Sequence, residues 1–107
     1  MSDPGRLNQR LLLEIATEMP DGAGGVVRGY AAGGAIWASV TPLSAREVVQ
    51  ASAVGVSVTH RIIMRAGLTL SPRDRLRQDT RIFRIATVRE QDSSGRFLVL
   101  EAEERRE

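Results

Sequence analysis

The 107-residue sequence contains no cysteine and a single histidine, His60. The absence of cysteine excludes disulfides and thiolate chemistry, and a zinc site would have to rest mostly on carboxylates. His60 is in phase with the apolar residues of an alternating run, so we expect a packed, hydrogen-bonded side chain in preference to a catalytic base. We therefore predict no metal, no cofactor and no catalytic residue.

The sequence also lacks a long apolar run, and Met1–Gly5 lacks the basic-then-apolar order of a signal peptide. A membrane span needs about 20 consecutive apolar residues. The expectation is one soluble domain over residues 1–107, made in the cytoplasm, with no membrane partner.

Lysine is absent, and all fifteen basic residues are arginine. This composition has two alternative explanations. One is codon bias in a GC-rich genome; the other is selection for the planar guanidinium, which suits carboxylate and phosphate contacts. The charge is uneven along the chain: residues 1–60 carry net −1, residues 61–89 carry +6 and residues 90–107 carry −3. The basic middle and acidic end indicate either contacts between neighbouring copies or a solvated mixed surface.

Aromatic residues are few: one tryptophan, one tyrosine and two phenylalanines. We interpret Trp37 as a core anchor. Barrels that bind nucleic acid by base stacking use several exposed aromatics, which this sequence cannot provide. The core is expected to be thin, and association with neighbours would cover strand edges.

The most informative stretch is Trp37–Arg65, which predicts a strand, a short helix and a second strand. Ser44 and Glu47 have the spacing of a capping box, so a helix should begin at Ser44 and end near Gly55. Small residues share one helical face. They are Ala45, Val48, Val49, Ser52 and Ala53.

Alternating or apolar runs predict the strands of the chain. Turn residues, which are glycine, proline, aspartate and serine, separate these runs. The runs are Leu11–Glu18, Val26–Tyr30, Trp37–Val40, Val58–Arg65, Arg81–Arg89 and Phe97–Glu103. We expect turns at Met19–Gly25 and Asp92–Gly95, a flexible glycine-rich linker at Ala31–Ala35, and a frayed tail at Glu103–Glu107. The predicted fold class is mainly β: a small antiparallel β-barrel or sandwich with one short α-helix inserted between strands.

The strongest basic cluster lies in the second half of the chain. It comprises Arg73, Arg75, Arg77, Arg81 and Arg84. These side chains can face DNA phosphates or the acidic surface of a neighbouring subunit. The acidic residues near the C-terminus, Glu101 and Glu103, are interpreted as a solvated strand edge.

Three runs occur in a distinctive order. They are Trp37-Ala38-Ser39-Val40-Thr41-Pro42-Leu43-Ser44-Ala45-Arg46-Glu47, Thr59-His60-Arg61-Ile62-Ile63-Met64-Arg65 and the closing Leu98-Val99-Leu100-Glu101-Ala102-Glu103-Glu104. With the Gly24-Gly25 turn and Arg81-Ile82-Phe83-Arg84-Ile85, this order resembles the head-tail joining, or head-closure, family of tailed bacteriophages and phage-derived gene transfer agents.

The resemblance implies a non-enzymatic connector, or stopper, in the neck of a virion or phage-like particle assembled in the bacterial cytoplasm. It implies a ring of identical subunits, a homohexamer or alternatively a dodecamer, between the portal adaptor and the tail terminator or tail tube. The segment Thr41–Gly55 is then expected to face the channel and help retain packaged double-stranded DNA. Its polar contact residues would be Ser44, Arg46, Glu47 and Gln50.

The alternative is a free-standing nucleic-acid-binding β-barrel that uses the arginine cluster. Tight, steeply salt-dependent binding of duplex DNA by an isolated monomer would favour it.

Overall fold

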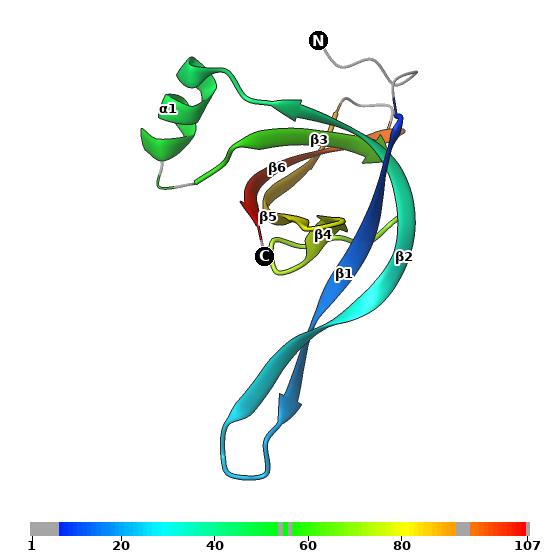
Figure 1. Ribbon diagram of the computed structural model, residues 1–107, viewed down its shortest axis with the longest axis vertical. Helices are drawn as coiled ribbons and strands as arrows, with labels where there is room; N and C mark the ends of the chain where they lie inside the picture. The colour runs from blue at the N-terminus through cyan, green and yellow to red at the C-terminus, as the bar shows by residue number, and fades with distance from the viewer. Residues whose placement is uncertain (1–6, 54, 56, 92–94, 107) are drawn as a thin grey trace.

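The chain folds into a closed six-stranded barrel with one helix outside it, as a computed structural model shows (Figure 1). The structure describes residues 7–53, 55, 57–91 and 95–106. Its elements are β1 (Gln9–Pro20), β2 (Val26–Pro42), α1 (Ala45–Ala53), β3 (His60–Arg65), β4 (Arg75–Gln78), β5 (Arg81–Glu90) and β6 (Phe97–Arg106). The predicted mainly β class is confirmed, and the sheet closes as a barrel.

Every strand pairs antiparallel with its neighbours, in the order β1-β2-β3-β6-β5-β4 and back to β1. Closure rests on the short β1–β4 ladder, which joins only Leu12–Glu14 to Arg75–Arg77. Because the barrel is closed, its body leaves no sheet edge open for pairing.

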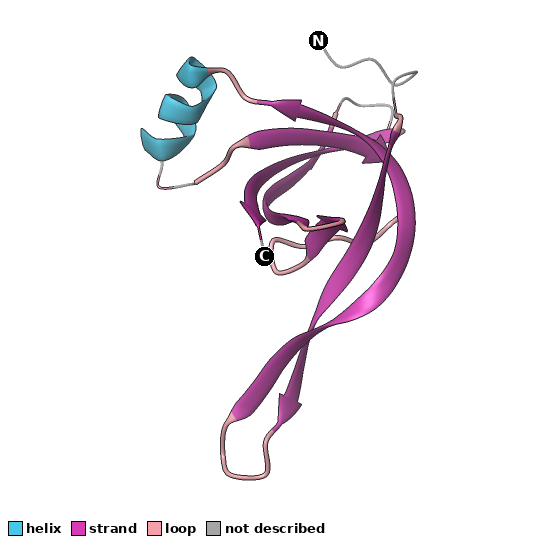
Figure 2. Cartoon of the chain, in the orientation of Figure 1, coloured by secondary structure: helices cyan, strands magenta, loops and turns pink. Residues whose placement is uncertain are grey.

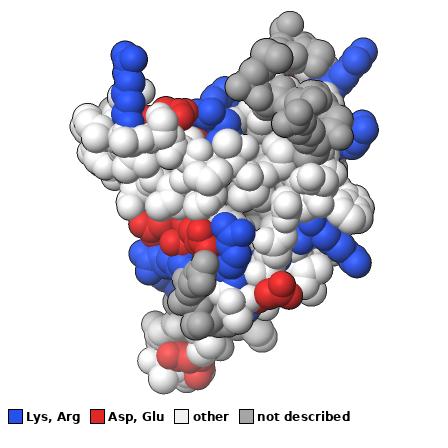
Figure 3. All heavy atoms as spheres, turned by 45° about the horizontal axis from the view of Figure 1, so that its top comes forward, with Lys and Arg blue, Asp and Glu red and all other residues white. Residues whose placement is uncertain are grey.

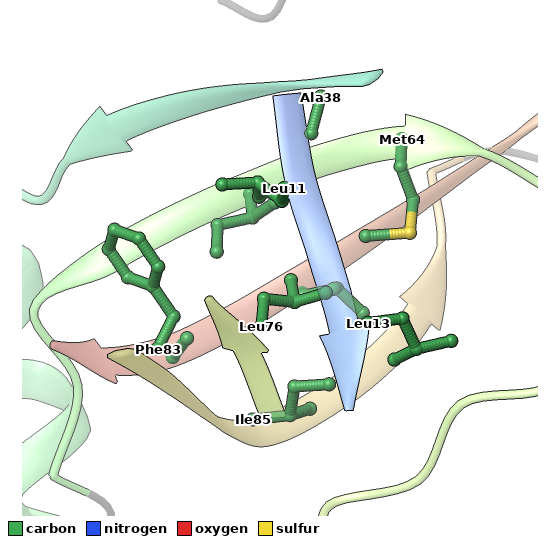
Figure 4. Close-up of a cluster of buried hydrophobic side chains, with 10 residues drawn as sticks. Leu11, Leu13, Ala38, Met64, Leu76, Phe83 and Ile85 are labelled. Atoms are coloured by element: carbon green, nitrogen blue, oxygen red, sulfur yellow. The ribbon is translucent and has the colours of Figure 1, made fainter. Parts of the chain in front are cut away.

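Alternate residues of the strands fill the barrel interior (Figure 4). Phe83, Leu11, Ile62, Leu76 and Leu100 are fully buried there. Ala38 is buried as well, while its neighbour Trp37 is 60% exposed, so the interpretation of Trp37 as a core anchor was wrong. The prediction placed the wrong set of alternating β2 residues inside the barrel. The small Ala38 faces the crowded interior, and the indole of Trp37 points outward.

The glycine-rich run Ala31–Ala35 is part of β2 and not a linker, which corrects the prediction (Figure 2). The ladder shifts register between Leu13, paired with Gly34, and Glu14, paired with Ala32, so Gly33 is the extra residue of a bulge. A Cβ at Gly33 would lie 2.9 Å from Cγ of Leu13. The glycines therefore permit a close approach inside a continuous 17-residue strand.

Two strands extend further than the sequence predicted. β1 continues through Met19 and Pro20, so the turn begins only at Asp21. The end of β6 is not frayed, because Glu103–Arg106 pair with Arg81–Arg84 of β5. β3 begins at His60, two residues later than expected. Most of the predicted turn Asp92–Gly95 lies outside the described residues.

Candidate functional site

Helix α1 lies beside the barrel and buries none of its residues (Figure 1). Val49, on the face of small residues, is 67% exposed. The predicted N-terminus is confirmed: the Glu47 amide donates to Ser44 Oγ at 3.2 Å, and the Ser44 amide donates to Glu47 Oε1 at 3.1 Å. The capping box thus fixes a helix that has no buried residue of its own.

Glu47 also ties α1 to the barrel, because its carboxylate accepts a hydrogen bond from the guanidinium of Arg61 on β3. The Ser44 amide, followed by Arg61, holds the pKa of Glu47 below its ordinary value. Of the four residues expected to line a channel, Ser44 and Glu47 hold the helix itself, whereas Arg46 and Gln50 are exposed. Sequence reasoning missed Arg61, whose charge on the facing strand was the available signal.

The chain enters and leaves this segment at neighbouring points. The Leu43 amide donates to the Thr59 carbonyl oxygen at 2.9 Å, just before α1 and just before β3. A polypeptide that departs and returns at one place forms an insertion that the barrel does not need for its own closure.

The arginine cluster is largely engaged with carboxylates of the same chain. Arg73 Nη2 lies 2.8 Å from Glu18 Oε1, and Arg75 Nε lies 2.6 Å from Glu14 Oε1. Glu14 also accepts from Arg77 Nε at 3.3 Å. These pairs connect β4 and the turn before it to β1.

At the other side of the cluster, Arg81 of β5 donates twice to Glu104 of β6, at 2.7 and 3.1 Å. Arg84 is exposed and lies opposite Glu103 of β6, whose charge it stabilises. On the side of the molecule that Figure 3 shows, acidic and basic side chains lie next to one another. Four of the five arginines are thus partly neutralised, which reduces the charge available to a polyanion.

His60 has the packed setting expected of it. Its ring lies edge-on to Phe83 with centroids 5.4 Å apart, and Nδ1 lies 2.9 Å from Thr59 Oγ1. Burial lowers its pKa, although the nearby Glu104 opposes that shift.

The two acidic residues interpreted as a solvated edge are partnered. Glu101 accepts from Thr87 Oγ1 at 3.2 Å, and Glu103 accepts from Ser57 and Arg105. Across the described residues, no three metal-ligating side chains gather into a potential metal site. No helix in that part of the chain is long and apolar enough to cross a membrane.

Beyond the predicted residues, the structure exposes a long β1–β2 hairpin and two surface hollows. One hollow of about 490 Å³ lies between the hairpin and the turn at Pro72–Asp74. The other, of about 580 Å³, lies next to Trp37 and Leu68. The signal for the hairpin was the continuation of the Leu11, Leu13, Ile15 alternation to Met19.

Comparison with known proteins places these features in a family context. Residues 2–105 match the family model described as phage head completion protein. A chain in the virion of a native gene transfer agent particle is 32% identical with a TM-score of 0.66, and the match covers 94% of this chain and 96% of that one.

A second solved structure supports the fold alone. It is the solution structure of protein SF1141 from Shigella flexneri 2a, at 23% identity and a TM-score of 0.77, with 96% of each chain covered. A search of curated proteins finds no match.

Proposed function

The chain belongs to the phage head completion protein family, and from this membership we propose that it closes the filled head as a ring between the portal adaptor and the tail. It is a structural protein of the head–tail region of a phage or gene transfer agent particle. In the proposed ring, identical barrels surround the packaged double-stranded DNA and offer a docking surface to the tail.

The observation that carries this proposal is the extent of the family match. Residues 2–105 fit the head completion model, and 94% of the chain superposes on a component of a gene transfer agent virion at 32% identity. Since both matches span the barrel and its inserted helix, they support a common role for the whole chain.

The channel segment Thr41–Gly55 is proposed to retain DNA by occupying space. Helix α1 has no buried residue, and the paired backbone at Leu43 and Thr59 separates it from the barrel. Small side chains such as Ala45 and Ala53 permit close approach around a narrow bore. Arg46 and Gln50 are exposed and available for polar contacts with DNA or a neighbouring subunit.

The proposed mechanism makes and breaks no covalent bond. The Ser44 hydroxyl is engaged as the cap that precedes α1, and His60 is packed against Phe83. Retention follows from sterics, and release follows when tail attachment rearranges the segment.

The intramolecular ion pairs weigh against the alternative of a free-standing nucleic-acid-binding barrel. Arg75 and Arg81 would have to exchange Glu14 and Glu104 for phosphates, which lowers the net gain from counterion release. A ring needs no tight monomer–DNA affinity, because the bore confines the duplex.

A deletion tests whether the channel segment Thr41–Gly55 acts as a gate, that is, whether it retains the packaged DNA. Replacing residues 44–56 by a four-residue glycine–serine linker should preserve the barrel, since Leu43 and Thr59 are already adjacent. Particles complemented with this variant should contain the protein but lose packaged DNA, measured as nuclease-resistant DNA per particle. The matched control is Thr80→Ser at the exposed β4–β5 turn, which should retain DNA.

Retention of DNA by the deletion particles would refute the gate. Absence of the chain from purified particles would refute the connector role itself.

A further inference from the structure

The β1–β2 hairpin extends beyond the barrel as a two-stranded arm, defined here as Ile15–Pro20 with Val26–Ala31 (Figure 1). The last β1–β4 pair is Glu14 with Arg75, so the outer part of β1 has only β2 as a neighbour. An isolated two-stranded hairpin is marginally stable in water. The arm therefore needs contacts beyond its own two strands to be stable.

One face of the arm supplies such contacts to its own chain. Glu18 faces Arg28 across the ladder and binds Arg73 of the turn before β4, while Tyr30 stacks under the guanidinium of Arg75 at 3.7 Å. The buried carboxylate of Asp74 accepts from the Ala16 amide at 2.9 Å. This polar face fixes the base of the arm to the barrel.

The opposite face is apolar and has no cover within the described part of the chain. Leu11 and Leu13 fill the barrel, and the same side of β1 continues outward as Ile15, Thr17 and Met19. Met19 pairs with Val27, so the two side chains share that face. Ile15 is 40%, Met19 66% and Val27 59% exposed; we call these three residues the apolar ribbon.

The tip beyond the ribbon is pre-organised. Asp21 Oδ1 accepts from the amides of Ala23 and Gly25 at 2.7 and 3.0 Å, and the Asp21 amide donates to the Gly25 carbonyl oxygen. A fixed tip loses little conformational freedom on binding. It also places the negative charge of Asp21 at the end of the arm.

A matching surface lies at the other end of β1. There, the hollow of about 580 Å³ is lined mainly by apolar side chains and one arginine. They are Leu7, Ile36, Trp37, Met64, Leu68 and Arg65. Trp37 is 60% exposed and Leu68 39%, and we call this hollow the tryptophan groove.

We propose that the apolar ribbon of one copy inserts into the tryptophan groove of a second copy. The groove residue Trp37 pairs with Arg10, so along β1 the groove lies about 15 Å from Ile15 and about 30 Å from Met19, and an extended strand cannot fold the ribbon back into its own groove. The acidic tip complements Arg65 at the groove, and the apolar surfaces are removed from water together.

This contact is heterologous, because two different surfaces of the same chain meet. Heterologous contacts generate closed rings when the rotation between copies closes. The inference rests on the proposed ring and specifies the contact that joins its subunits. Tryptophan side chains that lose their water on binding often contribute most of the binding energy of an interface, so Trp37 is suited to this role.

Cysteine cross-linking tests the contact without background, because the sequence has no cysteine. Particles are assembled with the double variant Met19→Cys and Leu68→Cys and treated with a short bismaleimide. The expected product is a ladder of multimers ending at the ring. Particles mixed from the two single variants should yield dimers that contain one copy of each.

Two controls separate proximity from chance. Pairing Leu68→Cys with Thr80→Cys, at an exposed turn residue, should give no ladder. Adding Val27→Ser to the double variant should reduce the ladder at least tenfold while the circular dichroism of the free protein is unchanged, because Val27 lies on the arm, outside the buried core, and is 59% exposed.

Particles that contain the chain and hold DNA but show no Met19–Leu68 product would overturn the arm contact and leave the proposed function intact. Cross-links between two Met19→Cys chains, or from Met19→Cys to a different virion protein, would also overturn it. If the chain is missing from particles, both proposals fail.

Discussion

The barrel and the two segments that project from it are stabilised in different ways. The barrel has a buried cluster that includes Phe83, Ile62 and Leu100, and each strand of its body pairs on both sides. Helix α1 buries nothing, and the arm carries three of the most exposed apolar residues of the described chain, Met19, Val27 and Val26. Stability therefore resides in the barrel, and the surfaces suited to contact reside in the projections.

This division fits a protein that must fold first and assemble later. A barrel with its own core does not need its neighbours to fold, whereas apolar surface on a projection gains free energy only when a partner covers it. The polar face of the arm and the capping box of α1 hold both projections in shape before assembly.

The largest expected effect separates core from projection. Phe83→Ala should lower the free energy of unfolding by about 3–5 kcal/mol, because Phe83 is fully buried and leaves a cavity. Val49→Ala on α1 should change it by less than about 0.5 kcal/mol. Urea unfolding followed by circular dichroism measures both; equal losses would break the distinction between barrel and projection.

The junction of arm and barrel should show an intermediate effect. Asp74 is only 7% exposed and accepts hydrogen bonds from the amides of Ala16 and Ser71. Asp74→Ala should cost about 1.5–3 kcal/mol of unfolding free energy and speed amide exchange at Ala16. Thr80→Ala is the exposed control; unchanged exchange at Ala16 in the Asp74 variant would show that the arm is anchored elsewhere.

A smaller and local effect is expected at the helix cap. Ser44→Ala removes the acceptor for the Glu47 amide and should destabilise α1 by about 1 kcal/mol, a roughly fivefold faster amide exchange in the helix. The urea transition of the barrel should not move. A shifted transition would mean that α1 and the barrel unfold as one unit.

The smallest effect is a pH dependence of the same helix. The folded pKa of Glu47 is lowered by the Ser44 amide and by Arg61, so its stabilisation is present above about pH 4.3 and is lost as the pH falls through the lower folded pKa. Exchange in α1 should therefore differ between the native protein and Glu47→Gln at pH 6, and the difference should vanish in acid. A difference that persists in acid would exclude this carboxylate as the cause.

The sequence was most informative where local chemistry determines structure. The Ser44–Glu47 capping box, the β3 alternation and the Arg81–Arg89 strand depend on neighbouring residues, and each is present in the structure. The resemblance to the head-closure family was likewise confirmed by the family match.

The wrong predictions concern features that depend on contacts between residues distant in the sequence. Alternation around Trp37 and Ala38 does not say which phase faces the interior, and the glycines at 33 and 34 suggest a loop unless Leu13 is known to pack against them. Likewise, Glu103–Arg106 form strand only because β5 is there to pair with them. The sequence did not predict that the arm extends beyond the barrel. The period-two alternation of β1 is the same inside and outside the barrel, so it does not mark where β1 leaves it.

Amide hydrogen exchange of the chain, free in solution and within assembled particles, tests the division between barrel and projections most directly. The account predicts equal, strong protection of β3, β5 and β6 in both states, with α1 and the outer arm gaining protection only in particles. Protection of α1 and the arm that does not change on assembly would contradict it.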